Sequence, residues 1–241
     1  MVEFIPKQVI QKIAEQDLWR YRSYTGDFNL EFPLDIGDVF QRIFGLQIDF
    51  IDLTQEESLK KVSTQNTWGG LYPEKCFFQG KDKVILINTG YAGMTEEFCR
   101  FAIAHAGGHY ALHYRAEGAF NAGWEDIIRF SSGPSTPLLS GPLFCNPLDI
   151  YHPLEIQASY YAAAILVPRG EIFRLTGGPN LLNLYHHENE LCHKFGVSRQ
   201  ILELRLQHLE AELEADRRSN QHFYSLSESA KNLGSIEKLA P

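Results

Sequence analysis

Long hydrophobic runs are missing from this 241-residue sequence. No apolar stretch approaches the ~18 residues that a membrane-spanning helix needs. Residues 1–16 are amphipathic and mixed in charge, without the apolar segment of a secretory signal. An excess of positive charge is missing too, because the formal net charge is −8. We therefore expect a cytoplasmic protein that does not enter a membrane, and direct nucleic-acid binding is not expected.

Cysteine is scarce, and its distribution argues against a disulfide framework. The four cysteines lie far apart and form no Cys-x-x-Cys pair, as is typical of thiols in a reducing compartment. Cys145 falls in a stretch rich in turn-forming residues, which leaves a metal-binding or redox role open as a minor alternative. The remaining composition, 44% hydrophobic and 22% charged, is that of an ordinary globular protein with one large domain or two small ones.

The stretch over residues 95–114 predicts a buried helix that carries a metal site. It is apolar on most faces, and Thr95 is placed to cap it, with two glutamates in the first turn. His105 and His109 are four residues apart, so both imidazoles project from one face and can reach a single ion. Two hydrogen-bonded core histidines would give the same pattern.

The residues between the two histidines are unusual for a helix. Gly107 and Gly108 each cost on the order of 1 kcal/mol relative to alanine, so they indicate that another backbone or a substrate approaches closely. In the known motif His-Glu-x-x-His, the Glu acts as the general base beside a zinc ion. Here Ala106 occupies that position. The candidate ligands are present and the general base is absent.

A third candidate ligand lies at the start of the next strongly predicted helix, which covers residues 154–167 and ends at Pro168. Glu155 can serve the dipole of this helix, or it can complete the metal site. Ser159 lies one turn later on the same face, where its hydroxyl can orient a ligand imidazole.

Hydrophobic periodicity predicts an α+β fold in which a small sheet packs against the histidine-bearing helix. Two helices are expected before it, over residues 6–22 and from Asp35 to Gly45. The expected strands are residues 46–53, a short segment around Leu71 and Tyr72, and a hairpin whose arms are Cys76 to Phe78 and Val84 to Ile87.

Four stretches, taken in order, resemble the ImmA/IrrE family of zinc peptidases. They are Pro33 to Leu53; Val84 to Asn88 followed by Arg100 to His113; Glu155 to Pro168; and Phe195 to Ser198 with Arg205 and Leu206. The resemblance implies a zincin-like, gluzincin-type core in which His105, His109 and Glu155 bind Zn²⁺, with water in the fourth place. It also implies a protein substrate, a DNA-binding transcriptional repressor, and a role in stress or mobile-element regulation.

Two positions depart from the family pattern. Ala106 replaces the general-base Glu, and Ser159 stands where an Asn or an acidic residue is common. General acid–base catalysis contributes roughly 10²–10⁴-fold, so zinc binding should survive while peptidase activity is very low. Ala106 is then either a substitution that disarms an enzyme, or the native residue of an inactive zinc-binding regulator that sequesters a transcription factor. Candidates to stabilise a transition state are Tyr110, His113, Tyr151 and His152; His113 fits a supporting or core role equally well.

The predicted elements and the family resemblance together divide the chain into four parts. Residues 1–65 form helices and a strand that pack on the core, and residues 66–175 form the metallopeptidase core. Within that core, the turn-rich loop 115–153 is either a lid or recognition element, or a mobile insertion. Residues 176–218 have a helix-turn-helix outline, although a plain helical hairpin is preferred because the second helix is acidic. Residues 219–241 are expected to be a weakly ordered tail.

Overall fold

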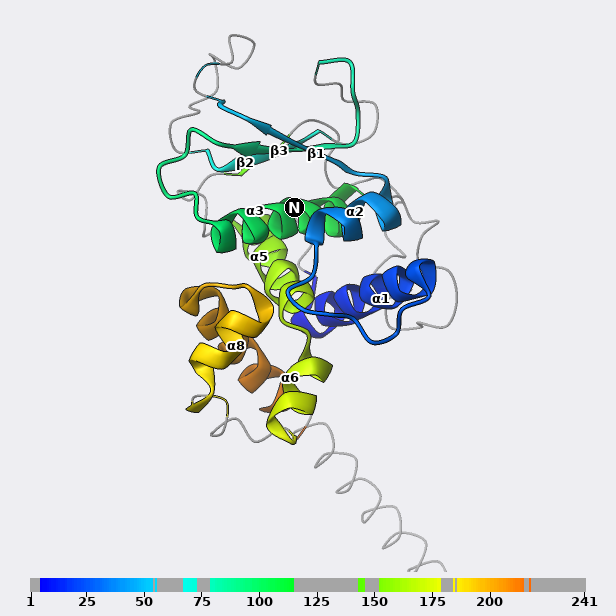
Figure 1. Ribbon diagram of the computed structural model, residues 1–241, viewed down its shortest axis with the longest axis vertical. Helices are drawn as coiled ribbons and strands as arrows, with labels where there is room; N and C mark the ends of the chain where they lie inside the picture. Colours follow the sequence, from blue (N-terminus) through cyan, green and yellow to red (C-terminus); the bar gives the residue numbers. More distant parts are fainter. Residues whose placement is uncertain are drawn as a thin grey trace, which may run out of the picture.

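The computed structural model describes residues 5–53, 55, 67–72, 79–114, 143–145, 152–178, 184, 186–214 and 217. A small sheet lies along one side of the histidine-bearing helix α3 (Glu96–His109), and further helices lie on its other side (Figure 1). The predicted α+β class is therefore confirmed. Among the described residues, none of the helices combines the length and apolarity needed to cross a bilayer.

The two N-terminal helices begin and end where the sequence predicts. Helix α1 (Lys7–Thr25) follows Pro6 and ends at Gly26, whose positive φ of 71° suits glycine. Helix α2 (Ile36–Phe44) begins at Asp35, whose side chain accepts a hydrogen bond from the backbone N–H of Asp38 at 3.1 Å. It ends at Gly45, again with positive φ.

The sheet has four strands in the order β1-β3-β2-β4. Strand β3 is central: β1 runs parallel to it and β2 runs antiparallel, while β4 pairs antiparallel with the other edge of β2. The strands are β1 (Gln47–Ile51), β2 (Gly69–Tyr72), β3 (Val84–Asn88) and β4 (Leu143–Cys145). Both edges of β3 are thus occupied along its length.

Two predictions about the sheet need correction. The antiparallel partner of β3 is Gly69–Tyr72, and not the segment Cys76 to Phe78, which lies outside the described residues. The predicted loop 115–153 contains a strand, because Leu143–Cys145 forms β4. Residues 115–142 and 146–151, including Tyr151, lie outside the description.

Helix α3 crosses helix α5 (Pro153–Leu166) at very short range. A Cβ atom built on Gly108 would lie 3.0 Å from the backbone oxygen of Ala158, and one built on Gly107 would lie 2.2 Å from the ring of Phe40. The predicted close approach of another backbone is confirmed at Gly108, whereas the neighbour that approaches Gly107 is the side chain of Phe40. After His109, α3 widens into the π-helical turn η3 (Tyr110–Tyr114).

The C-terminal part is helical and packs into the same core. Helix α6 (Arg169–Thr176) follows α5, and α8 (Glu188–Phe195) ends at Gly196 before a helix over residues 199–214. That last helix buries Arg205, whose guanidinium donates to the backbone oxygen of Val167 at 3.0 Å. The helix-turn-helix outline is present, and its second helix is anchored in the core. Residues 218–241 lie outside the description.

Candidate metal centre

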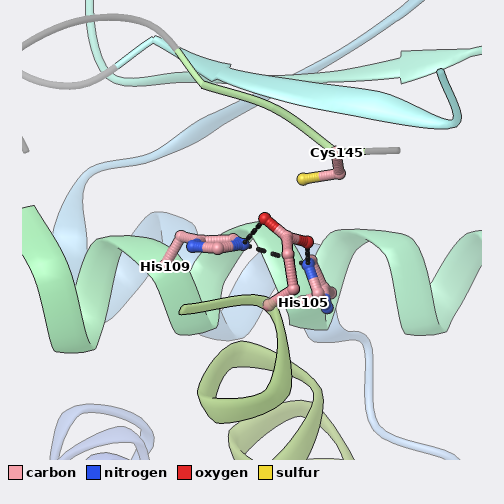
Figure 2. Close-up of side chains that lie close together, drawn as sticks. His105, His109 and Cys145 are labelled. Carbon is pink, nitrogen blue, oxygen red and sulfur yellow. Dashed lines mark hydrogen bonds and ion pairs between the residues drawn. The ribbon is translucent and has the colours of Figure 1, made fainter. Parts of the chain in front are cut away.

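Four side chains from three elements converge at one point between the sheet and the helices. His105 and His109 come from α3, Glu155 comes from α5, and Cys145 comes from β4. One donor atom of each lies within 4.8 Å of the other three, and all four residues are buried, with exposed fractions of 6% or less. Figure 2 shows Cys145 on the side of the sheet, with its sulfur turned toward the histidine pair.

The helix crossing explains why Glu155 reaches the histidines. The contact between Gly108 and Ala158 is the point of closest approach, and Glu155 lies three residues before Ala158, one turn along the same helix. His152 caps α5, since its Nδ1 accepts a hydrogen bond from the backbone N–H of Leu154 at 3.4 Å. This cap places the Glu155 carboxylate in the first turn, at the positive end of the helix dipole.

The donor atoms are closely spaced. Nε2 of His105 lies 2.9 Å from Oε2 of Glu155, and Nε2 of His109 lies 3.2 Å from Oε1 of the same carboxylate. The two Nε2 atoms are 3.0 Å apart. The chain therefore holds two imidazoles and one carboxylate in contact within the protein interior. The four-residue spacing of the histidines and the place of Glu155 at the start of the later helix predict this contact.

A hydrogen-bonded chain fixes which nitrogen of His109 carries its proton. Oε1 of Gln157 only accepts, so Nε2 of His113, 3.0 Å away, carries a proton and donates it. In a neutral imidazole the other nitrogen is then an acceptor, so Nδ1 of His113 accepts from Nδ1 of His109 at 3.0 Å. Nε2 of His109 is left with a lone pair that faces the cluster.

His105 is supported in a similar way from the α5 side. Oγ of Ser159 lies 3.2 Å from Nδ1 of His105, on the ring edge opposite the cluster. A hydroxyl can accept from the Nδ1 proton, which leaves the Nε2 lone pair directed at Glu155. Ser159 therefore lies where the sequence placed it, in contact with a candidate ligand.

Burial and charge favour the protonation state that a metal requires. Burial lowers the pKa of His109 to about 4 and the pKa of His113 to about 3, so both are neutral at pH 7. Burial acts to raise the pKa of Glu155, and hydrogen bonds donated by His105 and His109 act to lower it below its usual value. Those bonds form only while the Nε2 atoms of the imidazoles carry protons, which a bound metal ion would replace. For Cys145 burial acts the other way, because it raises the pKa of the thiol far above its ordinary value and so favours the neutral thiol until a metal binds.

A cation placed between these groups would satisfy all of them. The lone pair of His109 and the ionised carboxylate of Glu155 are both acceptors, and they face each other in a buried space beside His105. Imidazole nitrogen, carboxylate oxygen and thiolate sulfur are the ligand types that transition metals such as zinc bind. The buried cluster can therefore hold a metal ion.

The other candidate residues contribute no donor atom to the cluster. Ala106 is buried on α3 between the two histidines, and its methyl group can neither take up nor donate a proton. His113 contacts His109 and not the donor cluster itself, so it is a supporting residue. Tyr110 packs its ring against Phe44, with centroids 5.3 Å apart. His152 caps α5 from an exposed position.

No protein-family model matches this chain, and no curated protein matches it. Among solved structures, a Mycobacterium tuberculosis transcriptional regulator matches with a TM-score of 0.40 and 16% sequence identity. The match covers 85% of this chain and 51% of that chain, so this chain spans about half the length of that regulator.

Proposed function

We propose that the cluster is a zinc centre of the zincin, gluzincin type, in a peptidase of the ImmA/IrrE kind that Ala106 leaves nearly inactive. The observation that supports this most strongly is the convergence of His105, His109 and Glu155, whose donor atoms lie 2.9–3.2 Å apart. Two histidines and one glutamate form the ligand set of several catalytic zinc sites.

Each residue around the cluster has a defined part in this proposal. A bound zinc ion would polarise a peptide carbonyl and lower the pKa of a coordinated water. Glu155 supplies negative charge, while His113 and Ser159 hold the two imidazoles with their lone pairs inward. Ala106 has no group that can take up or deliver a proton, so hydrolysis should be roughly 10²–10⁴-fold slower than with a Glu there.

The substrate follows from the ImmA/IrrE resemblance alone. By that resemblance it is a DNA-binding transcriptional repressor, cleaved in stress or mobile-element regulation. A second candidate function is an inactive zinc-binding regulator that sequesters a transcription factor without cutting it. This alternative is favoured by Ala106, which cannot act as a general base, and by the thiol of Cys145, which lies where a coordinated water would otherwise be.

The zinc centre is tested by metal analysis of the full chain. We expect about one zinc per chain, lost when His105→Ala and His109→Ala are combined, because a carboxylate with at most one thiolate does not retain the ion. His187→Ala is the matched control, since His187 is exposed and, within the described part of the chain, its ring pairs with Glu190 at 3.0 Å rather than with the cluster. Equal zinc in both variants, or none in the parent protein, would overturn the proposal.

Hydrolysis is tested with fluorescent casein as a general protein substrate. Ala106→Glu should raise the rate by roughly 10²–10⁴-fold over the parent protein. The same substitution is also made together with Cys145→Ala, because the Cys145 sulfur lies beside the other donors. If both proteins bind zinc and neither cleaves casein, the peptidase proposal is wrong and the regulator alternative stands.

A further inference from the structure

The register of the sheet directs the side chain of Cys145 toward the histidines. Gly69 on β2 pairs with Ile87 on one side and with Cys145 on the other. Residues directly opposite each other in antiparallel strands point to the same face of the sheet. Ile87 is buried in the large core cluster that contains α3, so Cys145 points to α3 as well.

The position of Cys145 is fixed by backbone bonds as well as by its strand. The backbone N–H of Trp68, the residue before Gly69, donates to the backbone oxygen of Cys145 at 3.2 Å. The ring of Trp68 lies 5.4 Å from that of His105, between centroids. The sulfur of Cys145 is therefore carried on the sheet, across from Glu155, which is carried on α5.

The distances suit a four-ligand metal site. Zinc bonds of about 2.0–2.3 Å in a tetrahedron set the ligand atoms roughly 3.3–3.6 Å apart. The four donor atoms here lie within 4.8 Å of one another. The two imidazole Nε2 atoms are 3.0 Å apart, and each lies 2.9 or 3.2 Å from a different oxygen of Glu155. A small movement of the sulfur toward the other three atoms completes the tetrahedron.

We infer that the thiolate of Cys145 is the fourth protein ligand, so that the metal centre is closed by Cys145, His105, His109 and Glu155. This inference rests on the proposed zinc centre and adds that no coordination position is left for water or substrate. Binding replaces the S–H bond by a zinc–sulfur bond and releases the proton to solvent, with no change of oxidation state.

A second observation supports a thiolate at this place. The indole N–H of Trp68 is buried, with 8% of the residue exposed, and it has no hydrogen-bond acceptor among the described residues. This indole lies beside the thiol of Cys145. A thiolate accepts hydrogen bonds better than a neutral thiol, so metal binding at Cys145 gives this buried donor a partner.

A closed centre has a consequence for hydrolysis. A peptide carbonyl can reach the metal only when Cys145 leaves, and Cys145 is held by a short strand. Strand β4 has three residues, and among the described strands it pairs only with β2. Separation of β4 from β2 would therefore open the fourth position while His105, His109 and Glu155 stay in place on the helices.

Cobalt substitution tests the sulfur ligand directly. Cobalt-loaded parent protein should show a near-ultraviolet charge-transfer band from sulfur to cobalt and the intense visible bands of a tetrahedral site. Cys145→Ser should lose the charge-transfer band and still bind cobalt through the other three ligands. Cys192→Ser removes a free thiol on α8 away from the cluster, so this variant should keep the charge-transfer band.

The outcomes separate this inference from the proposed function. A folded, cobalt-loaded parent protein without the sulfur band overturns the inference, and no variant is needed for that result. A band that persists in Cys145→Ser overturns it too. A parent protein that binds neither zinc nor cobalt overturns the zinc centre itself, and the inference with it.

A small metal-binding probe tests whether the centre is closed. Acetohydroxamate, which coordinates zinc and cobalt through two oxygens, should leave the visible spectrum of the cobalt-loaded parent protein unchanged. In Cys145→Ala, which frees the fourth position, it should change that spectrum. Equal binding of acetohydroxamate to the parent protein and to Cys145→Ala would overturn the closed centre.

Discussion

The protonation of His109 is decided by a residue that does not touch the donor cluster. Gln157 accepts from His113, and His113 in turn accepts from Nδ1 of His109, so the lone pair of His109 is directed inward. A histidine ligand without such a partner can place its proton on either nitrogen, and only one of the two tautomers binds the metal. The affinity for zinc should therefore depend on His113.

We predict that His113→Phe weakens zinc binding by about 10–100-fold, because His109 loses the acceptor that fixes its tautomer. Phenylalanine keeps most of the volume of the side chain, so the fold should be retained. The affinity is measured by competition with a chromophoric chelator. His208→Phe is the matched control, because His208 is largely buried but stacks on Tyr160, with ring centroids 4.1 Å apart.

If His113→Phe and His208→Phe bind zinc with the same affinity as the parent protein, the hydrogen-bonded chain does not set the tautomer of His109. A loss of affinity in both variants would instead indicate a general effect of replacing a buried histidine. Only a loss confined to His113→Phe supports the argument.

At the scale of residues, the sequence located the histidine pair and the glutamate, whereas it offered Cys145 only as a minor alternative. The spacing of His105 and His109 is a local property of one helix, so it can be read without the fold. The place of Cys145 depends on the pairing of β4 with β2, which are distant in sequence. Three strand residues give no periodicity from which that pairing could be predicted.

At the scale of elements, the centre depends on how closely α3 and α5 cross. The Gly108–Ala158 contact leaves no room for a larger residue, and Tyr161 of α5 lies against the same glycine. Because Glu155 lies on α5 and both histidines lie on α3, any separation of the helices at this crossing moves the carboxylate away from the imidazoles. The short approach is therefore a condition for metal binding.

We predict that Gly108→Ala lowers both stability and zinc affinity. The new Cβ would lie 3.0 Å from the Ala158 backbone oxygen and from the Tyr161 ring, so α5 must shift by a few tenths of an ångström. Overpacking of a core costs about 1–3 kcal/mol, which exceeds the gain of up to about 1 kcal/mol from the helix propensity of alanine. Urea unfolding and zinc titration measure the two effects.

Gly170→Ala is the matched control for this experiment. Gly170 lies in α6, and no atom lies within 4 Å of a Cβ built there. The substitution should leave zinc affinity unchanged and stability unchanged or slightly raised. A Gly108→Ala protein that behaves in the same way would show that the close crossing is not needed for the centre.

The sequence predicted the helices better than the sheet, for a physical reason. Helix ends are marked by local chemistry, such as the Asp35 cap and the glycine at position 45 with positive φ. The partner of a strand is decided by non-local packing, so β3 was expected to pair with Cys76 to Phe78 and instead pairs with Gly69–Tyr72.

At the scale of the whole molecule, the helix over residues 199–214 is joined to the N-terminal helix by a buried polar network. The guanidinium of Arg205 donates to Gln11 of α1 at 2.8 Å and to Glu212 of its own helix at 2.9 Å. The hydroxyl of Tyr160 on α5 donates to the same carboxylate. The helix-turn-helix outline is thus part of the core, which supports the preference for a structural helical hairpin.

We predict that Arg205→Met destabilises the protein strongly, by about 3 kcal/mol, because it removes the buried partner of the Glu212 carboxylate and leaves only the longer contact with Arg169, at 3.8 Å, among the described ion pairs. Arg205→Met with Glu212→Gln should recover part of the loss, since no uncompensated charge then remains. Arg199→Met is the control: Arg199 is exposed, its pairs with Glu188 and Glu203 lie near the surface, and its loss should barely change stability. Urea unfolding of the zinc-loaded proteins measures the free energy of unfolding of all three variants. If Arg205→Met is no less stable than Arg199→Met, the network does not hold the C-terminal helix.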